Sequence, residues 1–247
     1  MKFSIITATF NSAKTLQFAI DSLRSQSYRN IEYIVIDGGS TDVTLEIIKQ
    51  NKNIVTKCTS EPDNGIYDAL NKGIAISTGD IIGTLHSDDV FAYPNVLQDV
   101  ENIFITTKAD AVYADLDYVK YNNIEKIERK WRSGKYKKDA FLNGWMPPHP
   151  TLFVKKEIYN KLGVFNLEFK TAADYELMLR FIHKHKIKLA YLPKVTVKMR
   201  MGGLSNSTLR HRIFANKEDR KAWVVNGLKP RFYTLYLKPL RKIFQYL

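Results

Sequence analysis

The sequence predicts an α/β fold with a mostly parallel central sheet flanked by helices. In the first hundred residues, short apolar runs alternate with segments whose apolar residues have helical spacing, the pattern of strand–helix–strand units. Two of the apolar runs end in acids, Asp37 and the pair Asp88-Asp89. The chain has 247 residues and is 45% hydrophobic, which is enough to bury the core of such a sheet.

The elements can be assigned in order from the N-terminus. Strands are expected over residues 3–8, 31–36, 54–59 and 81–85. Helices are expected after the capping residues Asn11-Ser12, after Asp42, and over residues 64–76. Each helix carries apolar residues three or four positions apart, so it has one face to bury. This order implies neighbouring parallel strands whose faces are covered by helices.

The composition excludes several classes of protein. Cys58 is the single cysteine, so no internal disulfide can form, and we expect an inert core thiol. The first residues lead directly into a strand, without the apolar region and cleavage site of a signal peptide. No stretch approaches 18 apolar residues, so no transmembrane helix is expected. These features predict a cytoplasmic protein.

Charge is distributed unevenly along the chain. Residues 1–100 carry 8 Lys/Arg and 12 Asp/Glu, whereas residues 101–247 carry 30 and 13, for a net charge of +13. A basic surface in the second half could bind nucleic acid, because neutralising phosphates drives such binding. An anionic membrane is the other partner that fits this charge.

The acids at the strand ends indicate a ligand site. In open α/β sheets, ligands bind beyond the carboxyl ends of the strands, where Asp37 and Asp88-Asp89 are expected. Hard carboxylate oxygens suit Mg²⁺ or Mn²⁺ ions that bridge phosphates. A turn or helix cap would explain either acid alone. Acids at two strand ends favour a site for a nucleotide and a metal.

An ordered set of motifs resembles family 2 glycosyltransferases. The motifs are SIITATFN (4–11), DGGSTD (37–42), SEPDNGIYDALNKGI (60–74), SDD (87–89), AADYEL (172–177) and GGLS (202–205). The resemblance implies the Rossmann-like GT-A fold and inverting transfer from a nucleotide-sugar, most often a UDP-sugar. It also implies a catalytic domain over residues 1–205, with a nucleotide-binding part (1–100) and an acceptor-binding part (101–205). A helical extension would follow over residues 206–247.

The resemblance assigns roles on the nucleotide side. Thr7, Thr9 and Asn11 lie where the first strand ends and are expected to contact the nucleoside, with helix capping as the alternative. Asp37 resembles the family residue that contacts the base. Asp63 resembles a residue of the nucleotide pocket rather than one of a simple turn.

The same resemblance implies a metal ion. Asp89 resembles the direct ligand of Mn²⁺ or Mg²⁺, and Asp88 a contact to the ribose or to the outer coordination layer. Such an ion would neutralise the diphosphate as it leaves. This chain has His86 where many relatives carry an acid or an amide, which leaves the metal preference open.

The acceptor side is expected in the second half of the chain. Asp174 resembles the general base, with a helix cap as the alternative, and Ala173 stands where relatives often carry a glutamate. Trp145 and His149 lie in a turn-rich segment and are expected to contact a sugar or a phosphate. As alternatives, Trp145 could be a structural aromatic, and His149 could donate a hydrogen bond to a buried backbone carbonyl. Arg200 and residues 201–205 are expected to form a loop that closes over the diphosphate.

The last nineteen residues change in character. Lys229–Leu247 contains five Lys/Arg, no acid and many large apolar residues. Pro230 and Pro239 predict two short amphipathic turns rather than one long helix. Such a segment can lie on an anionic bilayer with its aromatics inserted and its cations at the headgroups. Packing against the catalytic domain is the alternative.

Together these features predict an inverting, metal-dependent sugar transferase. We expect it to extend a surface polysaccharide on a polyprenyl-diphosphate carrier, peripherally bound at the inner face of the cell membrane. A sugar nucleotidyltransferase is an alternative, because its nucleotide-binding sheet can look similar. A basic nucleic-acid-binding protein would explain the charge but not the ordered carboxylates, so no nucleic acid partner is expected.

Overall fold

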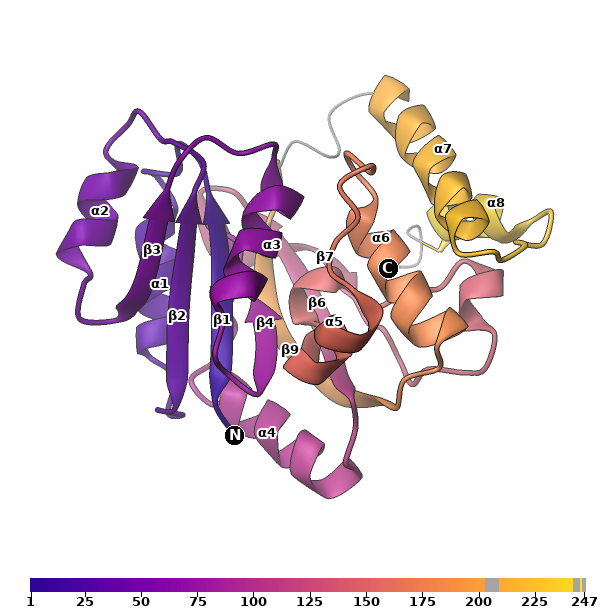
Figure 1. Ribbon diagram of the computed structural model, residues 1–247, viewed down its shortest axis with the longest axis horizontal. Coiled ribbons are helices and arrows are strands. Elements are labelled where there is room, and N and C mark those ends of the chain that lie inside the picture. The colour runs from indigo at the N-terminus through magenta and orange to yellow at the C-terminus, as the bar shows by residue number, and fades with distance from the viewer. Residues whose placement is uncertain (203–208, 242–244, 246–247) are drawn as a thin grey trace.

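The computed structural model describes residues 1–202, 209–241 and 245, and these form a sheet between two layers of helices (Figure 1). The described strands are β1 (Phe3–Thr9), β2 (Ile31–Asp37), β3 (Val55–Ser60), β4 (Ile81–Thr84), β5 (Val90–Phe91), β6 (Ala111–Lys120), β7 (Asn123–Trp131), β8 (Phe153–Lys155) and β9 (Leu189–Arg200). They make one sheet in the order β3-β2-β1-β4-β8-β6-β9-β5, with β7 paired to β6.

Helices of different lengths connect these strands. They are α1 (Leu16–Arg24), α2 (Thr44–Gln50), α3 (Ile66–Ile76), α4 (Val96–Thr107), α5 (Lys156–Leu162), α6 (Ala173–Met178), α7 (Leu209–Val225) and α8 (Thr234–Leu240). Two 3₁₀ turns, η1 (Ala140–Asn143) and η2 (His149–Thr151), lie in the turn-rich segment before β8. A π-helical segment, η3 (Leu179–Lys184), continues α6.

The two halves of the sheet differ in strand direction. Strands β3, β2, β1 and β4 are all parallel, as the strand–helix alternation predicts. Strand β8 then runs antiparallel to both β4 and β6, while β6 and β9 are parallel. The register sets Thr9 beside Asp37 and Asp37 beside Ser60, so the first three strands end at one edge. This edge lies at the top of Figure 1.

Both faces of the sheet are buried, so the central strands carry apolar residues on both faces. In β1, Ile6 packs on the side of α3 and α6, whereas Ile5 packs on the side of α1 and α4. Burial of one such side chain contributes about 1.5–3 kcal/mol. Helix α3 approaches β1 so closely that a Cβ at Gly73 would lie 2.4 Å from Cγ2 of Ile6. Any larger residue at position 73 would push the helix away from the strand.

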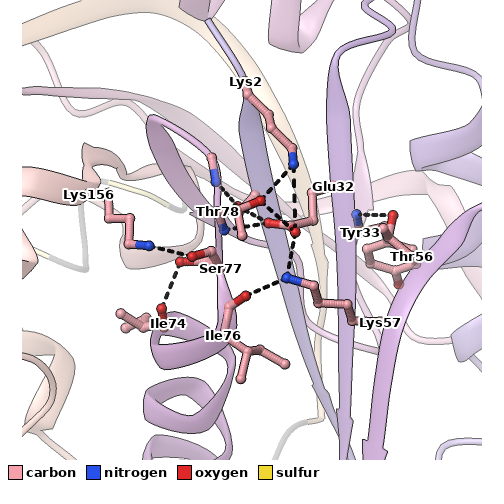
Figure 2. Close-up of polar contacts among 12 residues, drawn as sticks. Lys2, Glu32, Tyr33, Thr56, Lys57, Ile74, Ile76, Ser77, Thr78 and Lys156 are labelled. Carbon is pink, nitrogen blue, oxygen red and sulfur yellow. Dashed lines mark hydrogen bonds and ion pairs between the residues drawn. The ribbon is translucent and has the colours of Figure 1, made fainter.

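The amino end of the sheet is held by a buried carboxylate, Glu32 (Figure 2). Its oxygens accept hydrogen bonds from Ser4 Oγ at 2.6 Å and from the amide and hydroxyl of Thr78 at 2.7 and 2.8 Å. Lys57 Nζ lies 2.8 Å away and Lys2 Nζ 3.7 Å away. Burial opposes ionisation, but these partners outweigh it and lower the pKa of Glu32 to about 2. The network joins β1, β2 and β3 to the loop before β4.

Three local expectations need correction. Helix α1 begins at Leu16 rather than after Asn11-Ser12, because residues 12–15 form a separate turn in which the Ser12 carbonyl accepts from the Thr15 amide at 3.0 Å. Cys58 is exposed rather than buried, since the residues of edge strand β3 alternate in exposure. Pro239 lies within α8 instead of interrupting it. A proline has no amide hydrogen to donate to the carbonyl four residues before it. Here that carbonyl belongs to Leu235, and it accepts from Asn216 Nδ2 at 3.3 Å.

The C-terminal helices α7 and α8 pack on α6 and η1. Trp223 of α7 is fully buried, and its indole nitrogen donates to Tyr175 Oη at 3.0 Å. Thr234 of α8 donates its hydroxyl to the carbonyl of Leu142 at 2.6 Å. The boundary predicted between residues 205 and 206 lies outside the described residues. None of the described helices is long and apolar enough to cross a membrane.

Candidate active site

Asp37 organises the turn at the end of β2. The side chain is fully buried, and Oδ2 accepts from the amides of Gly39 at 3.1 Å and Ser40 at 2.9 Å. Oδ2 also accepts from the Ser60 hydroxyl at 2.7 Å, while Oδ1 accepts from that of Ser40. The predicted contact with a base stays a prediction. The observed role of Asp37 is to fix the turn that follows β2.

The residues at the end of β1 divide into two kinds. Thr7 is fully buried, and its hydroxyl donates to the Leu85 carbonyl at 2.5 Å and lies 3.0 Å from Tyr33 Oη. Its geometry therefore favours a structural role over the predicted nucleoside contact. Thr9 is buried, but its hydroxyl has no hydrogen-bond partner. It is the β1 hydroxyl left available for a ligand.

Asn11 and Asp63 bring two further loops to the same edge. Asn11 has a left-handed backbone, with φ of 48°, and its Oδ1 accepts from the Thr41 amide at 2.9 Å. Asp63 Oδ1 accepts from the Gly65 amide at 2.8 Å. A Cβ at Gly38 would lie only 2.7 Å from Asp63 Oδ2, so the missing side chain lets Asp63 reach the end of β2. Three segments expected around a nucleotide, the end of β1, the turn after β2 and the loop after β3, thus meet in the structure.

Asp89 is a buried carboxylate without partners. It is 1% exposed, and neither oxygen makes a hydrogen bond. The backbone of Arg200 faces it without reaching hydrogen-bonding geometry. Burial, and then the charge of Asp88, raise the pKa of Asp89 well above its usual value, and burial also raises the pKa of Asp88. A buried carboxylate of this kind is costly unless a cation binds it.

The carboxylates at this edge fit a divalent cation held together with a ligand. Among the described residues, no three His, Cys, Asp or Glu side chains form a ready metal cluster. Mg²⁺, however, is commonly bound by one or two carboxylates plus substrate phosphates rather than by an all-protein cage. The unpartnered oxygens of Asp89 next to Asp88 suit that arrangement.

Asp174 and His149 come together from distant positions. His149 Nδ1, in η2, lies 3.1 Å from Asp174 Oδ2, in the first turn of α6. Tyr67 of α3 donates its hydroxyl to Asp174 Oδ1 at 3.1 Å. Burial opposes ionisation of Asp174, but the charge and hydrogen bond of His149 outweigh it and lower its pKa to about 2. Asp174 is therefore ionised at neutral pH, as a proton acceptor must be.

His86 lies between the two acidic centres. It is 8% exposed, neither ring nitrogen has a hydrogen-bond partner, and its ring centroid is 5.5 Å from that of His149. Burial and the charge of His149 lower the pKa of His86 to about 3, so the ring is neutral. His86 follows β4 directly and precedes Asp88-Asp89. His86 therefore lies between the carboxylates Asp88-Asp89 and the His149–Asp174 pair.

The comparisons with known proteins agree with this arrangement. The model of the family described as glycosyl transferase family 2 matches residues 4–163. The chain belongs to this family. A relative described as an uncharacterized glycosyltransferase of Mycobacterium tuberculosis (strain ATCC 25618 / H37Rv) is 36% identical over 180 residues, 72% of this chain and 67% of the relative. A PGL/p-HBAD biosynthesis glycosyltransferase of the same strain is 29% identical over 210 residues, 83% of this chain and 79% of the relative.

Solved structures share the fold. Residues 1–349 of S. aureus TarS in complex with UDP-GlcNAc superpose with a TM-score of 0.70 at 18% identity, over 92% of this chain and 65% of that one. The mannosyltransferase PcManGT from Pyrobaculum calidifontis, in complex with GDP-Man and Mn²⁺, gives 0.68 at 18% identity, over 96% of this chain and 68% of that one. The expected GT-A fold is confirmed.

In this family 2 glycosyltransferase, the structure favours a structural role for Trp145. The ring is 8% exposed and makes edge contacts with Tyr113 and Phe141, each with centroids 5.6 Å apart. Its indole nitrogen donates to the Ser133 carbonyl at 2.9 Å. A ring covered in this way is not free to stack on a sugar. The predicted contact with a sugar or a phosphate stays a prediction, and the structure favours the structural alternative over stacking on a sugar face.

Tyr67 and Arg200 act on the carboxylates of this site. Tyr67 lies in one of the family motifs, but its bond to Asp174 spans 107 positions, which no local pattern reveals. Arg200 is 5% exposed, and its Nη1 donates to the Tyr121 carbonyl at 2.5 Å. Its charge favours ionisation of both Asp88 and Asp89. The rest of the predicted closing loop, residues 203–205, lies outside the described residues.

Proposed function

We propose that this chain is an inverting, metal-dependent glycosyltransferase that moves a sugar from a nucleotide-sugar, with UDP-sugars as the first choice, to a hydroxyl of a saccharide acceptor. The observation that carries the proposal is a pair of contrasting carboxylates. Asp89 is buried without a partner, whereas Asp174 is ionised and held by two donors. Support comes from the solved structures of similar fold, one described with UDP-GlcNAc and one with GDP-Man and Mn²⁺.

The metal-binding edge supplies electrostatic stabilisation in this proposal. Asp89, with Asp88 beside it, would hold Mn²⁺ or Mg²⁺, which when bound neutralises the charge of the departing diphosphate. Thr9, Asn11, Asp37 and Asp63 then line the nucleotide side, as assigned from the family motifs. The raised pKa of Asp89 fits this role, because a bound cation would favour the ionised form that burial disfavours.

Asp174 is the proposed general base. Inverting transfer needs a proton acceptor on the face of the sugar opposite the leaving nucleotide. Tyr67 and His149 each donate to one Asp174 oxygen and so fix the plane of its carboxylate. Each oxygen keeps lone-pair capacity for the acceptor hydroxyl. The ring of His149 also contacts the neutral ring of His86, which is close in sequence to Asp88-Asp89.

The proposed setting is synthesis of a surface polysaccharide on a polyprenyl-diphosphate carrier, at the inner face of the cell membrane. Around α8, the large side chains Phe232, Tyr236 and Leu240 are 88%, 67% and 51% exposed. Exposed Lys229 and Arg231 precede them in the chain. Exposed aromatics flanked by cations suit an anionic bilayer surface. A relative described as a PGL/p-HBAD biosynthesis glycosyltransferase supports a biosynthetic role for this chain.

A mass-resolved screen tests the function directly. Nucleotide-sugars would be offered with synthetic polyprenyl-diphosphate-linked sugars, and the product mass and anomeric configuration would be measured. We expect one donor to give a product of inverted configuration, dependent on Mn²⁺ or Mg²⁺. Release of pyrophosphate with formation of a nucleotide-sugar would instead support the nucleotidyltransferase alternative. Nucleotide release without a new glycoside would show hydrolysis and contradict the proposal.

The membrane role has its own test. The double variant Phe232→Ser/Tyr236→Ser removes two exposed aromatics without touching the buried Thr234 and Leu235. We expect weaker sedimentation with phosphatidylglycerol vesicles at low and high salt, at unchanged donor affinity. Ile105→Ser, at another exposed apolar position, is the control and is expected to sediment like the wild type. Unchanged sedimentation of the double variant would reject α8 as the membrane contact.

A further inference from the structure

A basic cavity lies between the end of β7, the loop after η1, and α8. Its volume is about 410 Å³. Four cations line it, Lys130, Arg132, Lys238 and Arg241, and Trp145 and Met146 form part of its apolar wall. No aspartate or glutamate is among the described residues of its lining. Nothing in the chemistry described above for donor or base uses this cavity.

The positive charge of the cavity is only partly compensated. Arg132 Nη1 lies 2.7 Å from Asp117, and Lys238 Nζ lies 2.6 Å from Asp219. For Lys130 and Arg241, the described part of the chain offers no ion pair, and Arg241 Nε donates to the neutral Asn143 carbonyl at 2.8 Å. Four cations around one cavity repel each other unless an anion enters. The lining therefore selects an anionic ligand.

One cation of the cavity lies near enough to Asp174 to act on it, since the charge of Lys238 contributes to lowering the pKa of Asp174. Lys238 Nζ lies 3.6 Å from the centre of the Tyr175 ring, and Tyr175 directly follows Asp174. Trp145, which lines the cavity, precedes His149 by four residues on the same segment. The donor edge is formed by other parts of the chain, at the ends of β1, β2 and β4. A molecule that reaches Asp174 with one end can thus place a second group among the four cations.

We propose that this cavity binds the phosphate or diphosphate group of the acceptor, so that the acceptor is a sugar phosphoester and not a neutral saccharide. The inference rests on the proposed function for its acceptor. Phosphate oxygens match the donors present, because arginine can bind two oxygens at once and lysine supplies a compact charge. The cavity would anchor the reducing-end phosphate while a sugar hydroxyl lies at Asp174.

Binding of inorganic pyrophosphate tests the cavity without any glycosyl transfer. Calorimetry would be done in EDTA, so that metal-dependent binding at the donor edge is removed. We expect Lys130→Gln/Arg241→Gln to weaken binding about tenfold or more, on the scale of hydrogen bonds to charged groups. Lys49→Gln/Lys52→Gln removes the same charge at α2, on the opposite side of the molecule, and is expected to bind as the wild type does (Figure 1). Equal weakening in both double variants, or no binding to the wild type, would overturn the proposal.

Kinetics identify the source of the phosphate. With a lipid-free sugar diphosphate as acceptor, Lys130→Gln/Arg241→Gln is expected to raise the acceptor KM about tenfold or more, at nearly constant kcat and donor KM. The same double variant should sediment with anionic vesicles as the wild type does. A loss of vesicle binding with an unchanged acceptor KM would overturn the proposal and assign the cations to lipid headgroups. If no nucleotide-sugar supports transfer, the proposed function fails, while the pyrophosphate result still decides the cavity.

Discussion

Two buried carboxylates at opposite ends of the same sheet have opposite environments. Glu32, near the amino end of β2, is 2% exposed and accepts hydrogen bonds from Ser4, Thr78 and Lys57. Asp89, beyond the carboxyl end of β4, is 1% exposed and accepts none. Their pKa values shift in opposite directions, down for Glu32 and up for Asp89. Burial alone therefore does not decide what a carboxylate does; its partners do.

The amino end of the sheet contributes to stability, whereas the carboxyl end is arranged for binding. At the amino end, every oxygen of Glu32 is used by the protein, so its charge stabilises the fold. At the carboxyl end, Asp89 makes no hydrogen bond and the charge of Arg200 offsets only part of the cost of burial, which lowers stability and leaves both oxygens free for a cation. Substitutions at the two ends should consequently affect different properties.

The largest effect is expected at the carboxyl end, for Asp174→Asn. An amide cannot take the acceptor proton, and loss of a general base commonly lowers turnover roughly 10²- to 10⁴-fold. Donor affinity should stay near that of the wild type, because Asp174 does not lie on the nucleotide side. Calorimetry with the donor and product formation would be compared, with exposed Glu157→Gln as the control. Parallel losses of affinity and turnover would instead make Asp174 structural.

The matching substitution at the amino end, Glu32→Gln, should damage stability and leave the chemistry intact. It leaves Lys57 and Lys2 without their partner, and breaking a buried pair costs roughly 3–5 kcal/mol. Thermal unfolding should show a Tm lower by about 6 °C or more, given about 2–4 °C per kcal/mol for this size. Turnover of the folded fraction should be unchanged. A wild-type Tm would show that the network around Glu32 contributes little.

Asp89→Asn should have the opposite effects, lowering turnover and raising the stability of the metal-free protein. Turnover is expected to fall about 10²-fold or more, on the scale of several kcal/mol for metal electrostatics. The metal-free protein should become more stable, by about 1 kcal/mol or about 2–4 °C in Tm, because a buried charge that is only partly compensated is removed. Scanning calorimetry with and without MnCl₂ and UDP checks both parts. A lower Tm in the metal-free variant would show that Asp89 has a stabilising partner.

The pH dependence of stability sharpens the comparison with a smaller effect. The pKa of Glu32 is lowered to about 2 from its ordinary 4.5, so its contribution is present above pH 4.5 and is lost as the pH falls from 4.5 to 2. The shift corresponds to roughly 3 kcal/mol. Asp89 has a raised pKa, so acid relieves its cost and the fold gains from protonation. The free energy of unfolding, measured with urea, should therefore change less between pH 4.5 and 2 for Glu32→Gln than for the wild type. An equal change with pH in both proteins would contradict the lowered pKa of Glu32.

The sequence was informative where function depends on neighbouring positions. Strand and helix order in the first 85 residues and the acids after β2 and β4 are local patterns, and the structure confirms where these elements lie. The start of α1 was misplaced, because several polar residues before Leu16 could serve as caps. Pro239 was misinterpreted because the partner of the Leu235 carbonyl comes from α7, outside any local window.

The environment of each site residue could not be predicted in the same way. The motifs pointed to Asp174 and His149 separately, but their 3.1 Å contact depends on how η2 and α6 pack. For Trp145, the sequence left open a contact with a sugar or phosphate and a structural role, because its burial depends on Tyr113 and Phe141, which lie on other elements. The lowered pKa of Glu32 depends on partners up to 46 positions away, and the pKa of Asp89 responds to burial, to Asp88 and to the distant Arg200. Charge, spacing and residue type do not encode such partners.

The Glu32 network also constrains how the chain can fold during synthesis. Its members come from Lys2, Ser4, Lys57 and Thr78, so the carboxylate gains its full set of partners only after position 78 has left the ribosome. Strand β1, made first, must likewise wait for β4 to complete its second edge. Closing such distant pairs is slow compared with forming helices. The parallel half of the sheet therefore completes this network only after more than a third of the protein has been made.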